Sequence, residues 1–356
     1  MNDYGFKVVA VEVSLINYRL TRPVGGSGVA AVDVVLARIR LADGPVGLGF
    51  SYVLGGSGAG AALLARELAE AQLVNRRLDH PEAAWRRMAL RLNRTRRGPN
   101  YIGLAALDLA LWDAYARALD VPLGIALGGA PREVPVYGSG EFHAQQSAAQ
   151  AADTARRQVE RGLRAVKPRV AARAADEALI AAVRAAIGTG VELMLDANEK
   201  GSATTAERLL AVARDHGALF VEEPLAADDV AGYRALARAH AGRIAAGEHL
   251  QGCTEALPFI SERLCAMVQP DLAMMGGMTE CLRVARLAEA FGVEVAPHFL
   301  PGLFIHLAAA SPALTWLEEF PLLEPLFEGW PQPGANGLLA LPPGPGHGLT
   351  LSPSPR

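Results

Sequence analysis

Cysteine is scarce in this chain of 356 residues, which contains only Cys253, Cys265 and Cys281. An odd number of cysteines without Cys-x-x-Cys spacing argues against a disulfide framework and against a zinc site. The first residues also lack the apolar core of a secretion signal. We therefore expect reduced thiols and a cytoplasmic protein.

Excess charge and long apolar runs are also missing. The net charge is −3 and no Lys/Arg-rich run is present, so the sequence predicts no nucleic-acid partner. The most apolar stretch, 301–317, is interrupted by Pro301, His306 and Pro312 and indicates a buried segment rather than a membrane span. We expect no membrane partner.

The sequence also lacks the motifs of phosphate-binding loops. The glycine clusters at 25–28 and 55–60 have neither Gly-Lys-Ser/Thr nor the spacing of a dinucleotide-binding turn. We interpret both clusters as mobile loops. What remains is an ordinary globular composition, with 51% hydrophobic and 20% charged residues.

The organisation of the chain changes near residue 134. Before it, alternating segments at 6–20 and 29–50 predict strands, and helical patterns follow at 62–72, 81–93 and 101–119. After it, short apolar runs recur at 134–138, 164–168, 191–196, 218–222, 243–247, 266–270, 293–297 and 314–317. Stretches of helical periodicity separate most of these runs, at 145–162, 175–187, 203–215, 229–240 and 279–291. Eight strands that alternate with helices predict an α/β fold with a parallel barrel, preceded by a smaller α+β domain. The tail from 331 is rich in Pro and Gly, and residues 338–341 could form one short strand.

Three acidic residues close successive barrel strands. Asp196, Glu222 and Glu248 are each 26 residues apart, about the length of one strand–helix repeat. In a parallel barrel this spacing places all three carboxylates at one end of adjacent strands. Three anions held together require a cation, and oxygen-only ligation suits Mg²⁺. Glu223 follows Glu222 directly, and strand alternation alone does not decide which of the two binds metal.

Other strand ends carry ionisable groups as well. The second strand supplies Lys167 and Arg169, which share a face because they are two residues apart. The sixth, seventh and eighth strands supply Asp271, His298 and Glu318. Taken singly, each could be a turn residue, a helix cap or a structural histidine. Their common position in successive repeats favours one active site at the carboxyl end of the barrel. His143, His249, His306 and Lys200 also fall near the presumed mouth, and we expect them to be peripheral.

The chain resembles the enolase superfamily, in its mandelate-racemase branch, over nearly its whole length. The segments that carry the resemblance are LysProArg (167–169), LeuAspAlaAsn (195–198), GluGluPro (222–224), GlyGluHis (247–249), the run 269–280, AlaProHis (296–298) and TrpLeuGlu (316–318). The resemblance implies a capping domain over 1–132, a modified (β/α)₇β TIM barrel over 133–325, and a C-terminal segment, 326–356, that returns to the cap. It also implies a homo-oligomer.

The same resemblance implies roles for the strand-end residues. Asp196, Glu222 and Glu248 would bind one Mg²⁺. His298 would be a general base paired with Asp271, and Glu318 would hydrogen-bond the carboxylate of a small-molecule substrate. The residue types suit this chemistry, because loss of the hydrogen alpha to a carboxylate gives an enediolate that a divalent cation stabilises.

One position departs from the family pattern. The branch typically has Lys-x-Lys on the second strand, and here the second position is Arg169. A guanidinium stays protonated and is a poor base, which disfavours a racemase that needs one base on each face. A dehydratase needs only His298, with Lys167 and Arg169 binding the carboxylate. We therefore expect an acid-sugar (aldonate or aldarate) dehydratase, with specificity set by the loops 21–28 and 51–60 and the tip 139–142.

Several alternatives stay open at this point. The first is a racemase, epimerase or cycloisomerase of a related hydroxy acid. A catalytically silent metal-binding barrel, a Mg²⁺-dependent phosphoryl-transfer barrel and a simple hydrolase are others. The sequence does not identify the acid.

Overall fold

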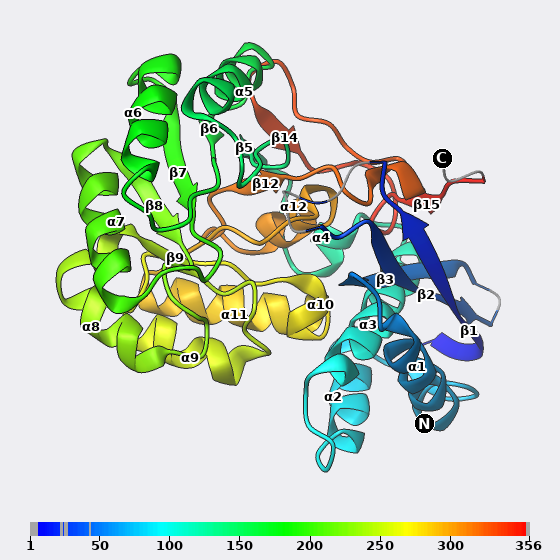
Figure 1. The fold of residues 1–356 in the computed structure, drawn as a ribbon. Coiled ribbons are helices and arrows are strands. Elements are labelled where there is room, and N and C mark those ends of the chain that lie inside the picture. Colours follow the sequence, from blue (N-terminus) through cyan, green and yellow to red (C-terminus); the bar gives the residue numbers. More distant parts are fainter. Residues whose placement is uncertain (1–5, 22–23, 25–27, 43, 354–356) are drawn as a thin grey trace.

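The computed structural model describes residues 6–21, 24, 28–42 and 44–353. An N-terminal α+β unit, drawn in blue and cyan, lies beside an α/β barrel drawn from green to orange (Figure 1). The red C-terminal segment runs along the barrel and reaches the N-terminal sheet (Figure 1). The predicted fold class is confirmed.

The N-terminal unit is a four-stranded antiparallel sheet covered by helices. The strands lie in the order β3-β2-β1-β4. Their bounds are β1 (Phe6–Arg19), β2 (Ala31–Leu41), β3 (Val46–Leu54) and β4 (Arg77–Leu78), and the helices are α1 (Gly58–Gln72), α2 (Pro81–Arg91) and α3 (Pro99–Ala118). The alternating segment 29–50 is thus two strands, joined by a turn after Leu41. Glycine lets α3 lie directly on β3, since a Cβ at Gly49 would come 2.2 Å from the Ala106 carbonyl oxygen.

Eight parallel strands form the barrel. They are β5 (Glu133–Gly138), β6 (Ala165–Val166), β7 (Glu192–Asp196), β8 (Ala218–Glu222), β9 (Ile244–Ala246), β10 (Met267–Val268), β11 (Glu294–Val295) and β12 (Leu317–Glu319). The order runs from β11 through β10, β9, β8, β7, β6 and β5 to β12. The outer segments meet where Val295 N donates to Ala313 O at 2.9 Å and Thr315 N donates to Val295 O at 3.0 Å. The eighth strand therefore begins three residues later than predicted, while Leu314 still bridges to Val295.

Helices cover the outside of the strands, as Figure 1 shows for α6 to α9. The main ones are α5 (Ala148–Glu160), α6 (Asp176–Ile187), α7 (Ala203–Asp215), α8 (Val230–His240), α9 (Cys253–Ser261), α11 (Met278–Phe291) and α12 (Pro301–Ala310), and α4 (Leu123–Ala126) and α10 (Leu272–Met275) are short. Ser147 and Ser202 form capping boxes at the starts of α5 and α7, which explains why those helices begin there. The apolar stretch after Pro301 forms the buried helix α12. Among the described residues, no helix has the length and hydropathy needed to span a membrane.

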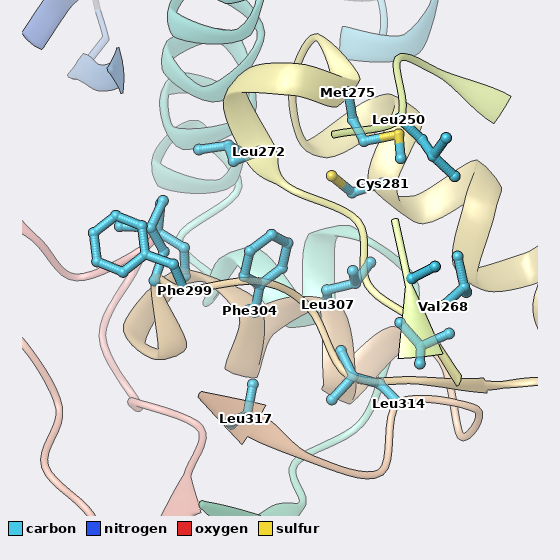
Figure 2. Close-up of a cluster of buried hydrophobic side chains, with 14 of the residues drawn as sticks. Leu250, Val268, Leu272, Met275, Cys281, Phe299, Phe304, Leu307, Leu314 and Leu317 are labelled. Atoms are coloured by element: carbon cyan, nitrogen blue, oxygen red, sulfur yellow. The ribbon is translucent and has the colours of Figure 1, made fainter. Parts of the chain in front are cut away.

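Two apolar layers support the barrel mouth. Inside the barrel, the side chains of Tyr137, Met194 and Phe220 fill the space between the strands. Outside it, Figure 2 shows a second cluster in which Val268, Leu314 and Leu317 lie beside side chains of α10, α11 and α12.

The C-terminal segment contacts both parts of the molecule. The predicted strand at 338–341 is present as β14 (Leu338–Ala340), which pairs antiparallel with β5. On either side of β14 in the sequence, β13 (Phe327–Glu328) and β15 (Thr350–Leu351) pair with each other. Buried His347 then bonds the N-terminal unit, because its backbone N donates to Asp113 Oδ1 at 2.9 Å and its Nε2 lies 2.7 Å from Leu48 O. The domain limits at 132 and 325 stay a prediction.

Candidate active site at the barrel mouth

The predicted acidic residues stand side by side at the strand ends. Asp196 ends β7 and Glu222 ends β8, and their Cα atoms are register partners in the sheet. Glu248 follows β9 after Gly247, whose φ of +139° is a conformation that favours glycine. Asn198 links two of these residues, since its backbone N donates to Asp196 Oδ1 at 2.9 Å and its Nδ2 to Glu248 Oε1 at 3.4 Å. Asp196 is thus adjacent to Glu222 in the sheet and shares the hydrogen-bond partner Asn198 with Glu248.

Lys167 connects the opposite sides of the mouth. Its side chain is 1% exposed, and its Nζ lies 2.6 Å from Glu222 Oε2 and 2.7 Å from Glu318 Oε1. Burial lowers the pKa of the Lys167 amine, but the two carboxylates outweigh burial and hold that pKa well above its ordinary value. Lys167 is thus held as an ammonium ion between the two carboxylates.

Arg169 occupies the second position on the same face. Its Nη1 donates to Asp196 Oδ2 at 2.9 Å, and its Nε is buried without a protein partner. Burial lowers the pKa of this guanidinium, but nearby carboxylates, Asp196 first, keep it above its ordinary value. Arg169 remains a cation beside the acidic residues, and its Nε–H is a hydrogen-bond donor that no protein atom accepts.

His298 and Asp271 form the predicted pair. His298 Nδ1 lies 2.9 Å from Asp271 Oδ2, and the opposite ring nitrogen, Nε2, lies 3.2 Å from Glu248 Oε2. Asp271 Oδ1 accepts a hydrogen bond from Met274 N at 2.9 Å, which fixes the carboxylate at the start of α10. Burial lowers the pKa of His298, but Glu248, Asp271 and Glu318 raise it to about 10. The imidazole is thus oriented by Asp271 and presents Nε2 to the acidic residues.

Glu318 is bound on both oxygens. Oε1 contacts Lys167 and Oε2 accepts a hydrogen bond from Phe299 N at 2.9 Å. Burial raises the pKa of this carboxyl, but Lys167 and His298 lower it to about 2. In this arrangement Glu318 is an anion that orients Lys167.

The charge balance of the mouth calls for another cation. Six carboxyl side chains there are 9% exposed or less: Asp196, Glu222, Glu223, Glu248, Asp271 and Glu318. The cations in direct contact with them are Lys167, Arg169 and the imidazoles of His298 and His249, because neighbouring carboxylates raise the pKa of those imidazoles to about 10 and about 9. The six carboxyl groups still outnumber these four cations. Burial raises the pKa of Glu222 to about 8 although Lys167 opposes this, and Glu222 Oε1 has no hydrogen-bond partner. A hard divalent cation fits this set of oxygen donors and would supply the missing charge.

The two adjacent glutamates face different partners. Glu222 contacts Lys167 and also accepts from Gln269 Nε2 at 2.6 Å, so it belongs with the inward-facing group. Glu223 instead contacts His249 Nδ1 at 2.8 Å. Among the described residues, the group whose ligand atoms all lie within 4.8 Å of one another is Glu199, Glu223 and His249, not Asp196, Glu222 and Glu248. The spacing of ligand atoms therefore favours Glu199, Glu223 and His249, and the assignment of the metal to Asp196, Glu222 and Glu248 stays a prediction.

A cavity of about 670 Å³ opens above these residues, and both parts of the chain line it. Of the loops expected to set specificity, Val24 and the segment Tyr52–Leu54 contribute to the wall, while residues 22–23 and 25–27 lie outside the described part of the chain. The tip 139–142 is displaced from this cavity. Gly140 and Glu141 line a smaller neighbouring cavity of about 280 Å³ instead.

Three of the four residues expected to be peripheral line a cavity, and the fourth is buried elsewhere. Lys200 and His249 line the main cavity, whereas His143 lines the smaller one. His306 is fully buried on α12, where its Nδ1 accepts from Gly124 N at 3.1 Å. It is therefore not at the mouth.

Three polar residues of the site were missed by the sequence analysis. Gln269 had a usable signal, because it lies two residues before Asp271 and alternation puts both on one face. Asn198 looked like an ordinary turn residue. Tyr52 comes from β3 in the N-terminal unit, and its hydroxyl donates to Asp271 Oδ2. No local pattern marks that contact.

Comparison with known proteins identifies the family. The model of the mandelate racemase / muconate lactonizing enzyme N-terminal domain matches residues 10–128, and the enolase C-terminal domain-like model matches residues 150–354. This chain belongs to the enolase superfamily. Within it, the match to the N-terminal model places the chain in the mandelate racemase / muconate lactonizing enzyme group, as the sequence predicted.

Several characterised members of this superfamily are similar over most of their length. An L-talarate/galactarate dehydratase from Salmonella typhimurium is 31% identical over 335 residues, which are 91% of this chain and 84% of that protein. A D-galactarolactone cycloisomerase from Agrobacterium fabrum is 29% identical in an alignment that covers 97% of each protein. The crystal structure of L-talarate dehydratase from Polaromonas sp. JS666, complexed with Mg and L-glucarate, superposes with a TM-score of 0.92 at 32% identity. That comparison covers 98% of this chain and 96% of the other.

Proposed function

We propose that this enolase-superfamily member is a Mg²⁺-dependent dehydratase of acid sugars, aldonates or aldarates. The observation that carries the proposal is the His298 imidazole, which is oriented by Asp271 and directed at Glu248, one of the acidic residues at the strand ends. The similar dehydratases support the reaction class. The protein is also proposed to be a cytoplasmic homo-oligomer with no nucleic-acid or membrane partner, in keeping with three free cysteines.

Asp196, Glu222 and Glu248 would hold the metal, since they lie at the ends of three adjacent strands and since Glu222 Oε1, like Glu223 Oε1, lacks a protein partner. The bound ion supplies Lewis-acid stabilisation of negative charge that develops on the substrate carboxylate. Lys167 and Arg169 complement the same carboxylate, because both remain cationic and Arg169 Nε has no protein partner. Glu318 contributes by orienting Lys167. Glu318 could donate a hydrogen bond to the substrate only if its carboxyl group were protonated, and the ion pair with Lys167 opposes this protonation.

His298 performs both proton transfers. Glu248 is the largest of the contacts that raise the pKa of His298 to about 10, and a bound divalent cation would offset its charge and free Nε2 of its proton. Nε2 would then accept the proton alpha to the carboxylate and return it to the departing β-hydroxyl, so that water leaves in a syn elimination. The resulting enol ketonises to a 2-keto-3-deoxy acid. Asp271 fixes the ring tautomer and stabilises the charged imidazolium between the two steps.

Arg169 favours dehydration over racemisation. A racemase needs a second base on the other face of the reacting carbon, and the guanidinium next to Asp196 cannot accept a proton. The alternative is epimerisation or cycloisomerisation of a related acid. The similarity to the D-galactarolactone cycloisomerase supports this alternative. Exchange of the alpha hydrogen with solvent deuterium without loss of water would favour that alternative.

The direct test is turnover of a panel of mono- and diacid sugars. We expect a 2-keto-3-deoxy product, detected as its semicarbazone, that forms with Mg²⁺ and not with EDTA. A panel that yields only isomerised acids would replace dehydration by the alternative. Absence of any alpha-hydrogen loss across mono- and diacids would contradict the proposal.

A further inference from the structure

Tyr52 brings the N-terminal unit into the acid–base pair. The residue lies on β3 and is 6% exposed. Its hydroxyl donates a hydrogen bond to Asp271 Oδ2, the same oxygen that lies 2.9 Å from His298 Nδ1. One carboxylate oxygen thus binds two donors, from a cap strand and from the end of a barrel strand.

The remaining contacts of Asp271 leave it little freedom. Its other oxygen accepts from Met274 N at 2.9 Å. Burial and the adjacent Asp271 carboxylate raise the pKa of the Tyr52 phenol well above 10, so the hydroxyl stays a donor. Three donors from three separate segments therefore hold the carboxylate that orients the imidazole. Removal of Tyr52 would leave Oδ2 held by His298 alone.

The ring of Tyr52 supports the other flank of the histidine. It packs edge-on against Phe299, with ring centroids 5.3 Å apart and planes at 86°. Phe299 follows His298 in the chain, and its backbone N donates to Glu318. Tyr52 consequently contacts the partner of the imidazole through its hydroxyl and the next residue through its ring.

We propose that Tyr52 is a positioning residue that fixes the orientation of His298 through Asp271. The inference rests on the proposed role of His298 as the base. It also links the cap to catalysis, because the next two residues of β3, Val53 and Leu54, line the substrate cavity.

Substitution Tyr52→Phe tests the hydroxyl while it keeps the ring against Phe299. We expect kcat to fall roughly tenfold to a hundredfold, as for loss of a hydrogen bond to a charged group, with KM changed less than about threefold. Tyr18→Phe is the matched control, since Tyr18 is a buried cap tyrosine beside the smaller cavity. Unchanged kcat in Tyr52→Phe, or an equal fall in the control, would overturn the inference.

A second measurement does not depend on turnover. In protein labelled with ¹⁵N-histidine, the Nδ1–H resonance of His298, assigned with His298→Asn, should shift in Tyr52→Phe and stay in place in Tyr18→Phe. In a double-mutant cycle, Tyr52→Phe should cost little once Asp271→Asn is present. If no acid is consumed, the proposed function fails while the resonance still tests Tyr52. A resonance that does not move would overturn the role of Tyr52 even if kcat falls.

Discussion

Two neighbouring carboxyl groups with the same chemistry have different surroundings in this protein. Glu222 lies against Lys167 and Gln269 inside the barrel mouth, whereas Glu223 lies against His249. Both are fully buried, so burial does not distinguish them. Their partners do. Glu222 shares its neighbourhood with Asp196 and Glu248, the other two proposed ligands.

A pair of amide substitutions separates the two candidate groups. Glu222→Gln removes one charge and one strong metal ligand, so we expect the affinity for Mg²⁺ to fall by more than roughly tenfold. Glu223→Gln should change it by less than about threefold. Calorimetric titration of Mg²⁺ into the metal-free protein measures both. A larger loss in Glu223→Gln would move the metal to Glu199, Glu223 and His249.

Residue roles were predictable where a local rule applied. Strand period and repeat length were enough to place Asp196, Glu222 and Glu248 at one barrel end, and His298 beside Asp271. The contact of Tyr52 with Asp271 joins two domains and follows no period. The ionised state of Glu318 likewise depends on Lys167, which follows β6 and is separated from β12 by β5, and only the folded arrangement reveals this contact.

At the scale of elements, the strand ends determine where each carboxylate points. The turn after β9 depends on Gly247, which has φ of +139°. A Cβ there would lie 2.9 Å from Gln269 N and 3.2 Å from Gln269 O. Since Gln269 also contacts Glu222, this turn couples the ends of β8, β9 and β10.

Substitution Gly247→Ala should therefore affect both stability and metal binding. We expect the free energy of unfolding to fall by about 1–3 kcal/mol, through overpacking and an unfavourable φ. The affinity for Mg²⁺ should fall as well, because Glu248 is displaced. Urea denaturation and calorimetry provide the two values. Gly242→Ala is the control, since a Cβ at Gly242 meets nothing within 4 Å; equal effects in both variants would contradict this account.

Helices and strands could be predicted where the pattern of apolar residues in the sequence was strong. The amphipathic helices and all eight barrel strands had clear periodicity. Helix α9 was missed, because it is short and contains Pro258. The eighth strand was placed too early, because Leu314 lies in an apolar run and bridges β11 before the regular strand begins.

At the scale of the whole molecule, a buried histidine pair joins the tail to the rest of the chain. His306 on α12 lies with Nε2 3.2 Å from the His347 carbonyl oxygen. His347 in turn contacts Asp113 and Leu48 of the N-terminal unit. This cluster connects barrel, cap and tail, and the resemblance to known proteins anticipated only that the tail returns to the cap.

The cluster makes folding sensitive to acid. Burial, and then His347, lower the pKa of His306 to about 3 in the folded protein. The unfolded chain, with an ordinary histidine pKa of about 6.5, takes up the proton first, so stability present above pH 6.5 is lost as the pH falls. Between pH 7 and pH 5, we expect the free energy of unfolding of the wild type to fall by about 2 kcal/mol more than that of His306→Gln.

Urea denaturation with EDTA at the two pH values measures this difference. His216→Gln serves as the control, because His216 lies at the end of α7, away from the cluster. This control should keep the acid sensitivity of the wild type. Equal losses in the wild type and His306→Gln would show that His306 does not carry the effect.

In the proposed reaction, His298 removes a hydrogen alpha to a carboxylate beside a bound Mg²⁺. The most direct measurement compares kcat of His298→Asn with that of His143→Asn on an acid sugar that the wild type dehydrates, at saturating Mg²⁺. We predict a loss of roughly 10²–10⁴-fold for His298→Asn with Mg²⁺ affinity retained, and no more than a twofold change for His143→Asn. A His298→Asn protein that keeps more than about a tenth of wild-type turnover would contradict the account.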